Sequence, residues 1–362
     1  MLVVFWALPK RVLALSSSHP SSHPSGPPPG SGTLIKRHGW ATSMSGVTAC
    51  LLGDTSVARE LGKVGTQSDI HLHDFKQDGR DVTVIVPARY PEQLKCLSYA
   101  VTDADAAVLV IAELNAQAGE QILAADAAGI PHGIILLTNY LQPEQIAPLL
   151  AGTGLAHWPV LTESDWPRIR AHLGQAPERS LDGPLMVPVD HHFDVKGVGA
   201  VILGVIKQGT LQKGETLHAY PDKVICPVRS IQCHDVDVPQ AVAGDRVGLA
   251  LRNTKADQLD RGMVLAHPDA DLNVHKTGDT VTFTLRRNRF SKQPLASGSV
   301  THLGVGMQFV PVRLSTDAPA AGTEAIVTGV LAKGLVVAPG ETGVLWHVDG
   351  APQRVVGAVS FP

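Results

Sequence analysis

The stretch Pro188–Gly209, PVDHHFDVKGVGAVILGVIKQG, decides the fold of the middle of this 362-residue chain. It is rich in β-branched residues and is interrupted by glycines, which is typical of strands in a small antiparallel barrel. Gly197 and Gly199 resemble the start of a dinucleotide-binding loop. In such a loop the third glycine follows three residues later and a helix comes next. Here the next glycine is Gly204, within a β-branched run. The pattern therefore predicts a β-barrel over residues 183–268.

Four further blocks follow this stretch in order, and together they carry a family resemblance. The blocks are Leu211–Glu215 (LQKGE), Val228–Asp235 (VRSIQCHD), Ala243–Leu251 (AGDRVGLAL) and Leu259–Ala266 (LDRGMVLA). The region resembles domain 2 of the translational GTPases (EF-Tu-like proteins), and within them the selenocysteine-specific elongation factors (SelB). The resemblance implies that Asp190, His191 and Arg246 form a pocket for the amino acid carried by a tRNA. Charge-assisted hydrogen bonds suit that role. The alternative is a structural ion pair between Asp190 and Arg246.

Residues 44–180 alternate short apolar strands with helix-like segments. We expect strands at Val47–Leu52, Val82–Val86, Ala106–Ile111 and Gly133–Leu137, and helices at Pro91–Thr102, Gly119–Ala128 and Pro143–Leu150. Strands that alternate with helices form a mainly parallel sheet with both faces covered. The resemblance identifies this segment as a degenerate P-loop GTPase-like α/β domain.

The nucleotide-binding motifs of that domain are eroded. The first loop, Gly53 to Val64, departs from G-x-x-x-x-G-K-[ST] in spacing and in its last residue, and Asp54 adds a negative charge. Against the family pattern, the degenerate site comprises Gly53, Asp54, Lys63, Pro87, Arg89 and Asn139. Ile85 stands where the family has its magnesium-linked aspartate, and Leu141 stands in the guanine-reading motif. We therefore expect no cofactor, and GTP with Mg²⁺ only if this atypical site still binds it.

Residues 270–362 continue with β-type runs, and the resemblance implies a second barrel like EF-Tu domain 3. Strands are expected at Thr280–Leu285, Ser299–Leu303, Phe309–Leu314, Glu324–Leu331, Val344–Val348 and Val355–Val359. A basic cluster, Arg286, Arg287, Arg289 and Lys292, lies between the first two. In a translation factor such a cluster could contact tRNA phosphates. The alternative is an exposed hairpin that its charges keep soluble.

Composition limits the remaining possibilities. Thirty Lys and Arg residues against 33 Asp and Glu residues give a net charge of −3, which offers no general attraction for DNA. Four cysteines without a C-x-x-C pair argue against a disulfide framework. No apolar run reaches the length of a membrane span. Residues 1–43 are rich in Ser, Pro and Gly and are expected to be a disordered tail or a mis-called start. We expect a cytoplasmic monomer.

The sequence is compatible with four functions. The first is an elongation-factor-like protein that binds aminoacyl-tRNA or the ribosome without hydrolysing GTP, so no catalytic residue is assigned. The second is a functional GTP-binding elongation factor with an atypical nucleotide site. The third is a metal-dependent hydrolase, suggested by His71, His73 and Asp74 and by the pair His191–His192, but without the further ligand spacing of known metal motifs, so no metal is expected. The fourth is a scaffold for protein assembly.

Overall fold

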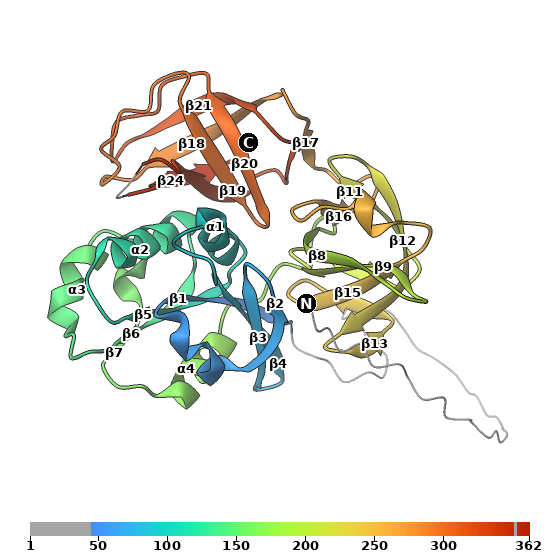
Figure 1. Cartoon of the computed structure of the whole chain (residues 1–362), viewed down its shortest axis with the longest axis horizontal. Coiled ribbons are helices and arrows are strands. Elements are labelled where there is room, and N and C mark those ends of the chain that lie inside the picture. Colours follow the sequence, from blue (N-terminus) through green and yellow to red (C-terminus); the bar gives the residue numbers. More distant parts are fainter. Residues whose placement is uncertain (1–44, 351–352) are drawn as a thin grey trace, which may run out of the picture.

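The computed structural model describes residues 45–350 and 353–362, which form an α/β domain followed by two β-barrels (Figure 1). The segment 1–43, for which a tail or a mis-called start was expected, lies outside the described residues. Within the described residues, no helix combines the length and the apolar character needed to cross a membrane. The three-part architecture expected from the sequence is confirmed.

The α/β domain is built on one seven-stranded sheet in the order β2-β3-β4-β1-β5-β6-β7. The five strands from β4 to β7 run parallel, while β2 and β3 form an antiparallel edge. The bounds are β1 Val47–Gly53, β2 Lys63–Gln67, β3 His71–Gln77, β4 Arg80–Val86, β5 Ala106–Ile111, β6 His132–Leu137 and β7 Val160–Leu161. The four expected strands are confirmed, with small shifts at their ends.

Helices cover both faces of this sheet. They are α1 Leu94–Thr102, α2 Ala116–Ala128, α3 Pro143–Leu150 and α4 Trp166–Gly174, with the short 3₁₀ segments η1 Thr55–Leu61 and η2 Gly154–His157. The helices α1, α2 and α3 pack on one face, and η1 and α4 pack on the other. Three of the four helices were expected. The fourth, α4, was not, although Asp165 caps it and Pro167 lies in its first turn, both ordinary helix-start signals.

The edge hairpin formed by β2 and β3 was also not expected from the sequence. Its first strand alternates between exposed and half-buried residues and is polar, so it lacks the apolar run that marks the central strands. The turn between the two strands contains Ser68, Asp69 and Ile70, and Ile70 is fully buried. This turn faces the first barrel, as described below.

The first barrel follows the linker after α4. Its strands are β8 Val187–Val195, β9 Gly199–Val205, β10 Thr210–Gln212, β11 Thr216–Tyr220, β12 Val224–Cys233, β13 Val236–Val238, β14 Gln240–Val242, β15 Arg246–Leu251 and β16 Val264–Ala266, with the 3₁₀ segment η3 Ala256–Gln258. The order β11-β16-β8-β9-β15-β12 closes on itself through pairing between β11 and β12. The glycine-interrupted stretch quoted above supplies β8 and β9.

The second barrel is closed in the order β18-β21-β20-β19-β23-β24. Its strands are β17 Asn273–His275, β18 Thr280–Arg287, β19 Val300–Val305, β20 Gln308–Leu314, β21 Glu324–Leu331, β22 Leu335–Val337, β23 Thr342–Trp346 and β24 Val355–Ser360. All six expected strands are present. Along β18, Val281, Phe283 and Leu285 are buried while Thr280 and Thr282 are exposed, the alternation of a strand with one face in the core.

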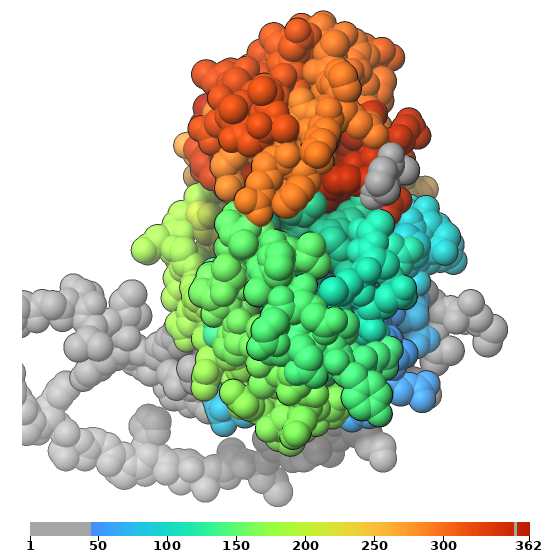
Figure 2. Space-filling view, turned by 90° about the vertical axis from the view of Figure 1, so that its left-hand side faces the viewer, coloured from blue at the N-terminus to red at the C-terminus, as the bar shows by residue number. Residues whose placement is uncertain are grey.

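The second barrel packs directly on α1 and α2 (Figures 1 and 2). Its residues Met307, Val344, Trp346 and Val355 belong to the same buried apolar cluster as the residues beneath α1 and α2. Gly304 allows the close approach, because a Cβ atom at this position would lie 2.0 Å from Ser98 Oγ of α1. The α/β domain and the second barrel therefore share one hydrophobic core.

Candidate functional site

The end of β1, where a phosphate-binding loop would begin, is occupied by internal hydrogen bonds. The Gly53 amide donates to Gln121 Oε1 at 2.6 Å, and the Asp54 amide donates to the Val110 carbonyl at 2.9 Å. The Asp54 side chain accepts from the Ser56 amide and begins η1. A phosphate-binding loop works because its backbone amides point freely at the ligand. Here the first two are already used by the protein.

The other residues of the degenerate site do not supply the missing contacts. Pro87 is buried just after β4, Arg89 is exposed, and Lys63 is exposed at the start of β2. Asn139 follows β6 and donates its side-chain amide to the Ala112 carbonyl at 3.3 Å. Ile85, at the position of the magnesium-linked carboxylate, lies in the apolar core. The residues present therefore do not fit a guanine nucleotide with Mg²⁺.

The structure brings Asp190, His191 and Arg246 together on the first barrel. The pairing of β8 with β9 shifts register between Val189 and His191. Successive side chains of a regular strand point to opposite faces, and a bulge of this kind redirects a side chain. As a result Asp190 and His191 meet, with 2.6 Å between Asp190 Oδ1 and His191 Nδ1. Arg246, at the start of β15, donates to both carboxylate oxygens of Asp190.

Asp190 is charged and almost fully enclosed. Its exposed fraction is 1%, and that of His191 is 8%. Burial alone would raise the pKa of Asp190, but the charge of Arg246 and the hydrogen bond from His191 hold it well below its ordinary value. In the same way, burial lowers the pKa of Arg246 and Asp190 raises it, with a net rise. The expected alternative, an ion pair between Asp190 and Arg246, is therefore present within the same cluster that the resemblance assigned to a pocket.

Three residues that were not assigned to the site from the sequence complete this cluster: Ser68, Asp69 and Arg261. Ser68 Oγ lies 2.9 Å from His191 Nε2. Arg261 donates from Nε to the Asp190 carbonyl at 2.7 Å and from Nη1 to Asp69 Oδ1 at 2.6 Å. Two of the three come from the β2–β3 turn of the α/β domain, so the cluster spans the boundary between this domain and the first barrel. Arg261 lies in a block quoted from the sequence, whereas nothing in the sequence marks the turn.

The basic cluster of the second barrel is only partly at the surface. Arg286, Arg289 and Lys292 are exposed. Arg287 is 6% exposed and donates to the Pro319 and Gln293 carbonyls, so it does not point to solvent. The assignment of Arg287 to a phosphate contact must be corrected: its place on β18 is the inward one. Arg289 donates to the Ala151 carbonyl, next to α3, and packs over Phe290.

The histidine pairs that suggested a metal site do not converge. His73 is buried and its Nδ1 lies 3.3 Å from the Gly62 carbonyl, while Asp74 accepts from Thr83 Oγ1 at 2.6 Å. His71 and His73 lie on one face of β3 and Asp74 on the other. Over residues 45–350 and 353–362, no group of three or more His, Cys, Asp or Glu side chains is arranged to hold a metal ion.

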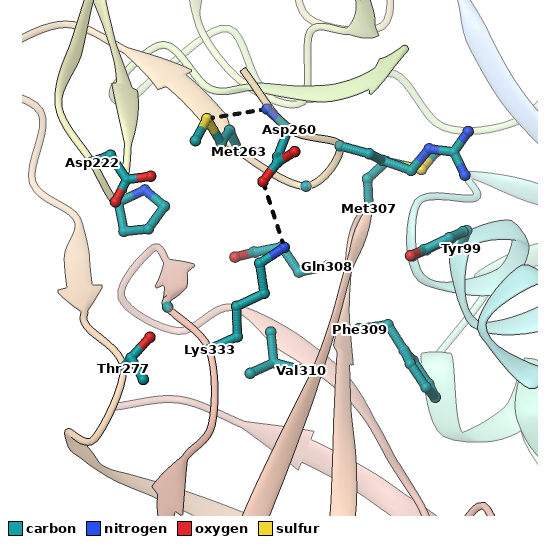
Figure 3. A pocket seen from close by; sticks show the side chains of 14 residues that line it. Tyr99, Asp222, Asp260, Met263, Thr277, Met307, Gln308, Phe309, Val310 and Lys333 are labelled. Carbon is teal, nitrogen blue, oxygen red and sulfur yellow. Dashed lines mark hydrogen bonds and ion pairs between the residues drawn. The ribbon is translucent and has the colours of Figure 1, made fainter. Parts of the chain in front are cut away.

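A cavity of about 220 Å³ lies where the three domains meet (Figure 3). Tyr99 of α1 lines it on one side, and Lys333 reaches from the second barrel towards Asp260 of the first, with 3.9 Å between their charged groups. Arg261 also lines this cavity and stacks 5.5 Å from the centre of the Tyr99 ring. The cavity and the Asp190 cluster therefore share Arg261.

Three comparisons with known proteins agree with this architecture. The family profile of elongation factor Tu domain 2 matches residues 199–266. The uncharacterized protein MJ0325 of Methanocaldococcus jannaschii is 35% identical over 269 residues, which is 74% of this chain and 85% of MJ0325. The selenocysteine-specific elongation factor of the same organism is 28% identical over 278 residues, 71% of this chain and 59% of that protein. The chain thus spans well under two thirds of the length of that factor.

Among solved structures, the translation elongation factor SelB from Methanococcus maripaludis in complex with the GTP analogue GppNHp superposes with a TM-score of 0.75 at 23% identity. The match covers 89% of this chain and 80% of SelB. This similarity shows that all three domains have the same fold as those of SelB. The chain therefore belongs to the family of MJ0325, its residues 199–266 match elongation factor Tu domain 2, and it has the three-domain fold of SelB.

Proposed function

We propose that this protein binds the aminoacyl end of a tRNA as an elongation-factor-like carrier that neither binds nor hydrolyses GTP. The observation that carries the proposal is the contrast between its two sites. The Asp190, His191 and Arg246 cluster is assembled with charge-assisted hydrogen bonds on an EF-Tu-like barrel. The amides of Gly53 and Asp54, by contrast, are consumed inside the α/β domain.

The chemistry of the pocket suits an aminoacyl group. Arg246 and Arg261 supply guanidinium donors for an ester carbonyl or a polar side chain, and buried Asp190 holds both in place, since its carboxylate accepts from Arg246 and its carbonyl from Arg261. Asp190 and His191 hold each other in position, so the pocket is organised before the ligand arrives, which limits the ordering cost of binding. We place the protein in the cytoplasm, as a monomer acting on aminoacyl-tRNA and on the ribosome.

The first test measures whether the two sites behave differently. Titration calorimetry with GTP and Mg²⁺ at about 1 mM should give no binding heat, because the amides of Gly53 and Asp54 are already hydrogen-bonded within the protein. Filter binding at low salt should detect aminoacyl-tRNA. A micromolar GTP affinity would favour the GTP-binding alternative, and the absence of any tRNA or ribosome binding would reject the proposal.

A matched pair of arginine variants tests the pocket itself. Arg246→Met removes the partner of Asp190 and should abolish the preference for aminoacylated over deacylated tRNA. Arg252→Met, at an exposed arginine of the same barrel, makes the same charge change and should leave that preference intact. RNA sequencing of material that co-purifies with the native protein would identify the tRNA.

The exposed arginines and lysine of the second barrel are proposed to add tRNA phosphate contacts. If Lys292 neutralises one phosphate, Lys292→Ala should reduce the slope of log affinity against log salt by about 0.7 to 0.9. An unchanged slope would leave Lys292 as a solubilising residue only.

A further inference from the structure

The hydrogen-bonding groups of the Asp190 cluster fall into two sets. The first set is satisfied within the barrel: both carboxylate oxygens of Asp190 bind Arg246, one of them also binds His191, and the Asp190 carbonyl binds Arg261. The second set faces the β2–β3 turn. It consists of His191 Nε2, which meets Ser68 Oγ, and of the Arg261 guanidinium end, which meets Asp69.

The two sets differ in how much they depend on the α/β domain. Because Asp190 accepts from His191 Nδ1, the proton of a neutral imidazole lies on Nδ1, and Nε2 is left as an acceptor. The Ser68 hydroxyl lies 2.9 Å from Nε2 and is also within hydrogen-bond distance of Asp69 Oδ1 and the Ile70 carbonyl. Arg261 Nη2 lies 3.3 Å from the same nitrogen. Removing the turn would therefore expose one imidazole nitrogen and one guanidinium end, without breaking a contact inside the barrel.

The Asp69 carboxylate accepts a hydrogen bond from Arg261, as an oxygen atom of a bound ligand would. Its carboxylate lies 2.6 Å from Arg261 Nη1, and Lys95 approaches its other oxygen at 3.7 Å. Burial would raise the pKa of Asp69, but the hydrogen bond and charge of Arg261 lower it, so the carboxylate stays ionised. The side chains of Asp69 and Arg261 remain 16% and 21% exposed, so this contact borders solvent, unlike the Asp190–Arg246 pair.

We propose that the Ser68–Ile70 turn is a gate over the aminoacyl pocket. In the closed state Ser68 and Asp69 contact His191 and Arg261, and the aminoacyl group of the tRNA (the cargo) replaces these contacts when it binds. This inference rests on the proposed function. Buried Ile70 anchors the end of the turn, so opening displaces Ser68 and Asp69 while the Ile70 side chain stays in the core. Cargo binding then exchanges two polar contacts at the domain boundary for equivalent contacts to the aminoacyl group.

A gate of this kind lowers the measured affinity by the fraction of molecules in which it is open. Weakening its contacts should therefore tighten cargo binding. Ser68→Ala removes the hydroxyl on His191 without any change in charge. Asp69→Asn weakens the contact to Arg261 and removes one negative charge. Partly exposed polar contacts of this type correspond to about a two- to fivefold change in affinity each.

The charge change of Asp69→Asn needs a control, because tRNA is an anion. Asp78→Asn makes the same change in the exposed turn between β3 and β4, where the Asp78 carboxylate binds only its neighbour Gln77 among the described hydrogen bonds. The probes are one tRNA in two forms, deacylated and carrying an amide-linked amino acid that cannot hydrolyse. The exchange of the Asp69 and Ile70 amides with deuterated water is followed with and without each probe.

We expect Ser68→Ala and Asp69→Asn to bind the aminoacylated form about two- to fivefold more tightly than the unaltered protein, with Asp78→Asn unchanged and the deacylated form unaffected. Aminoacyl-tRNA should also accelerate amide exchange in the turn. Equal affinities, weaker binding by Ser68→Ala, or equal gains for both tRNA forms would overturn the gate while leaving the proposed function in place. If no form of the protein distinguishes the two tRNAs, the proposed function falls and the gate falls with it.

Discussion

The α/β domain meets its two barrels in different ways. Towards the second barrel it contributes α1 and α2 to a continuous apolar core, in which Trp346 is fully buried. Towards the first barrel the contacts described above are polar and partly exposed, with Ser68 and Asp69 against His191 and Arg261. Apolar burial is largely insensitive to salt and lasts as long as the fold, whereas exposed charge pairs are screened and weak. The contrast predicts that salt weakens the contacts of the β2–β3 turn with the first barrel and leaves the apolar core shared with the second barrel unchanged.

The largest effect should come from the shared core. Trp346→Ala removes a fully buried indole between β23 and the helices, and we expect a loss of about 3 to 5 kcal/mol in the free energy of unfolding. Denaturant unfolding, followed by circular dichroism, measures it. Val236→Ala, at an exposed apolar position of the first barrel, is the control and should change stability by less than about 0.5 kcal/mol. If Trp346→Ala changed the free energy of unfolding as little as Val236→Ala does, the shared core would not be what holds the two domains together.

The next effect concerns a charged clamp between the same two domains. Glu120 of α2 is 3% exposed and accepts from the Arg354 guanidinium at 2.9 and 2.6 Å and from the Tyr90 hydroxyl at 2.8 Å. Glu120→Ala leaves Arg354 without its carboxylate in a mostly buried place, so we expect a loss of about 3 kcal/mol that salt hardly changes.

A double-mutant cycle with Arg354→Met isolates the clamp. The double variant should recover part of the loss, because no unpaired charge remains. If the losses in the free energy of unfolding were strictly additive, Glu120 and Arg354 would act independently. The pair would then not help to hold the second barrel on the α/β domain.

The ion pair between Asp190 and Arg246 should contribute a similar or smaller amount to the free energy of unfolding, and this contribution depends on pH. The folded pKa of Asp190 is lower than its ordinary value of 3.8, so its pairing contributes stability above that value and loses it as the pH falls through the folded pKa. At pH 7 we expect Asp190→Asn to be about 3 kcal/mol less stable than the unaltered protein. Unfolding curves between pH 7 and pH 3 should show this gap narrowing only below about pH 4. A gap independent of pH would assign the loss to packing.

The smallest change in the free energy of unfolding is expected where the β2–β3 turn contacts the first barrel. Asp69→Asn should cost only about 0.5 to 1 kcal/mol at low salt, because its pair with Arg261 borders solvent. Raising the salt concentration to about 1 M should remove most of that difference, since screening then acts within about 3 Å. If the loss stayed constant with salt, the polar interface would be as permanent as the apolar one.

The sequence predicted more of the core than of the site. Strands such as β5 and β6 are wholly apolar and could be placed almost to the residue. The inward orientation of Arg287 could also have been predicted. It lies an even number of residues after Val281, Phe283 and Leu285, so it points to the same face of β18 as they do. By the strand period Arg286 points outward and Arg287 inward, so the four basic residues do not form one exposed cluster.

The β2–β3 turn could not have been assigned to the site from the sequence alone. Ser68 is 123 positions away from its partner His191, and Asp69 is 192 positions away from Arg261. Neither residue lies in a motif or a periodic segment. Contacts of this kind depend on how two domains dock, which local patterns do not encode.

What the sequence determined by itself is the class of each domain and the position of Asp190, His191 and Arg246 on the first barrel. Strand and helix periods are local, and the glycine-punctuated blocks follow each other in order, so both can be identified without coordinates. Only the tertiary structure decided which of those residues are engaged. The amides of Gly53 and Asp54 are satisfied internally, Arg287 points inward, and His191 meets the α/β domain. The reason is that hydrogen-bond satisfaction and burial are set by neighbours distant in sequence, and these become neighbours only when the three domains pack.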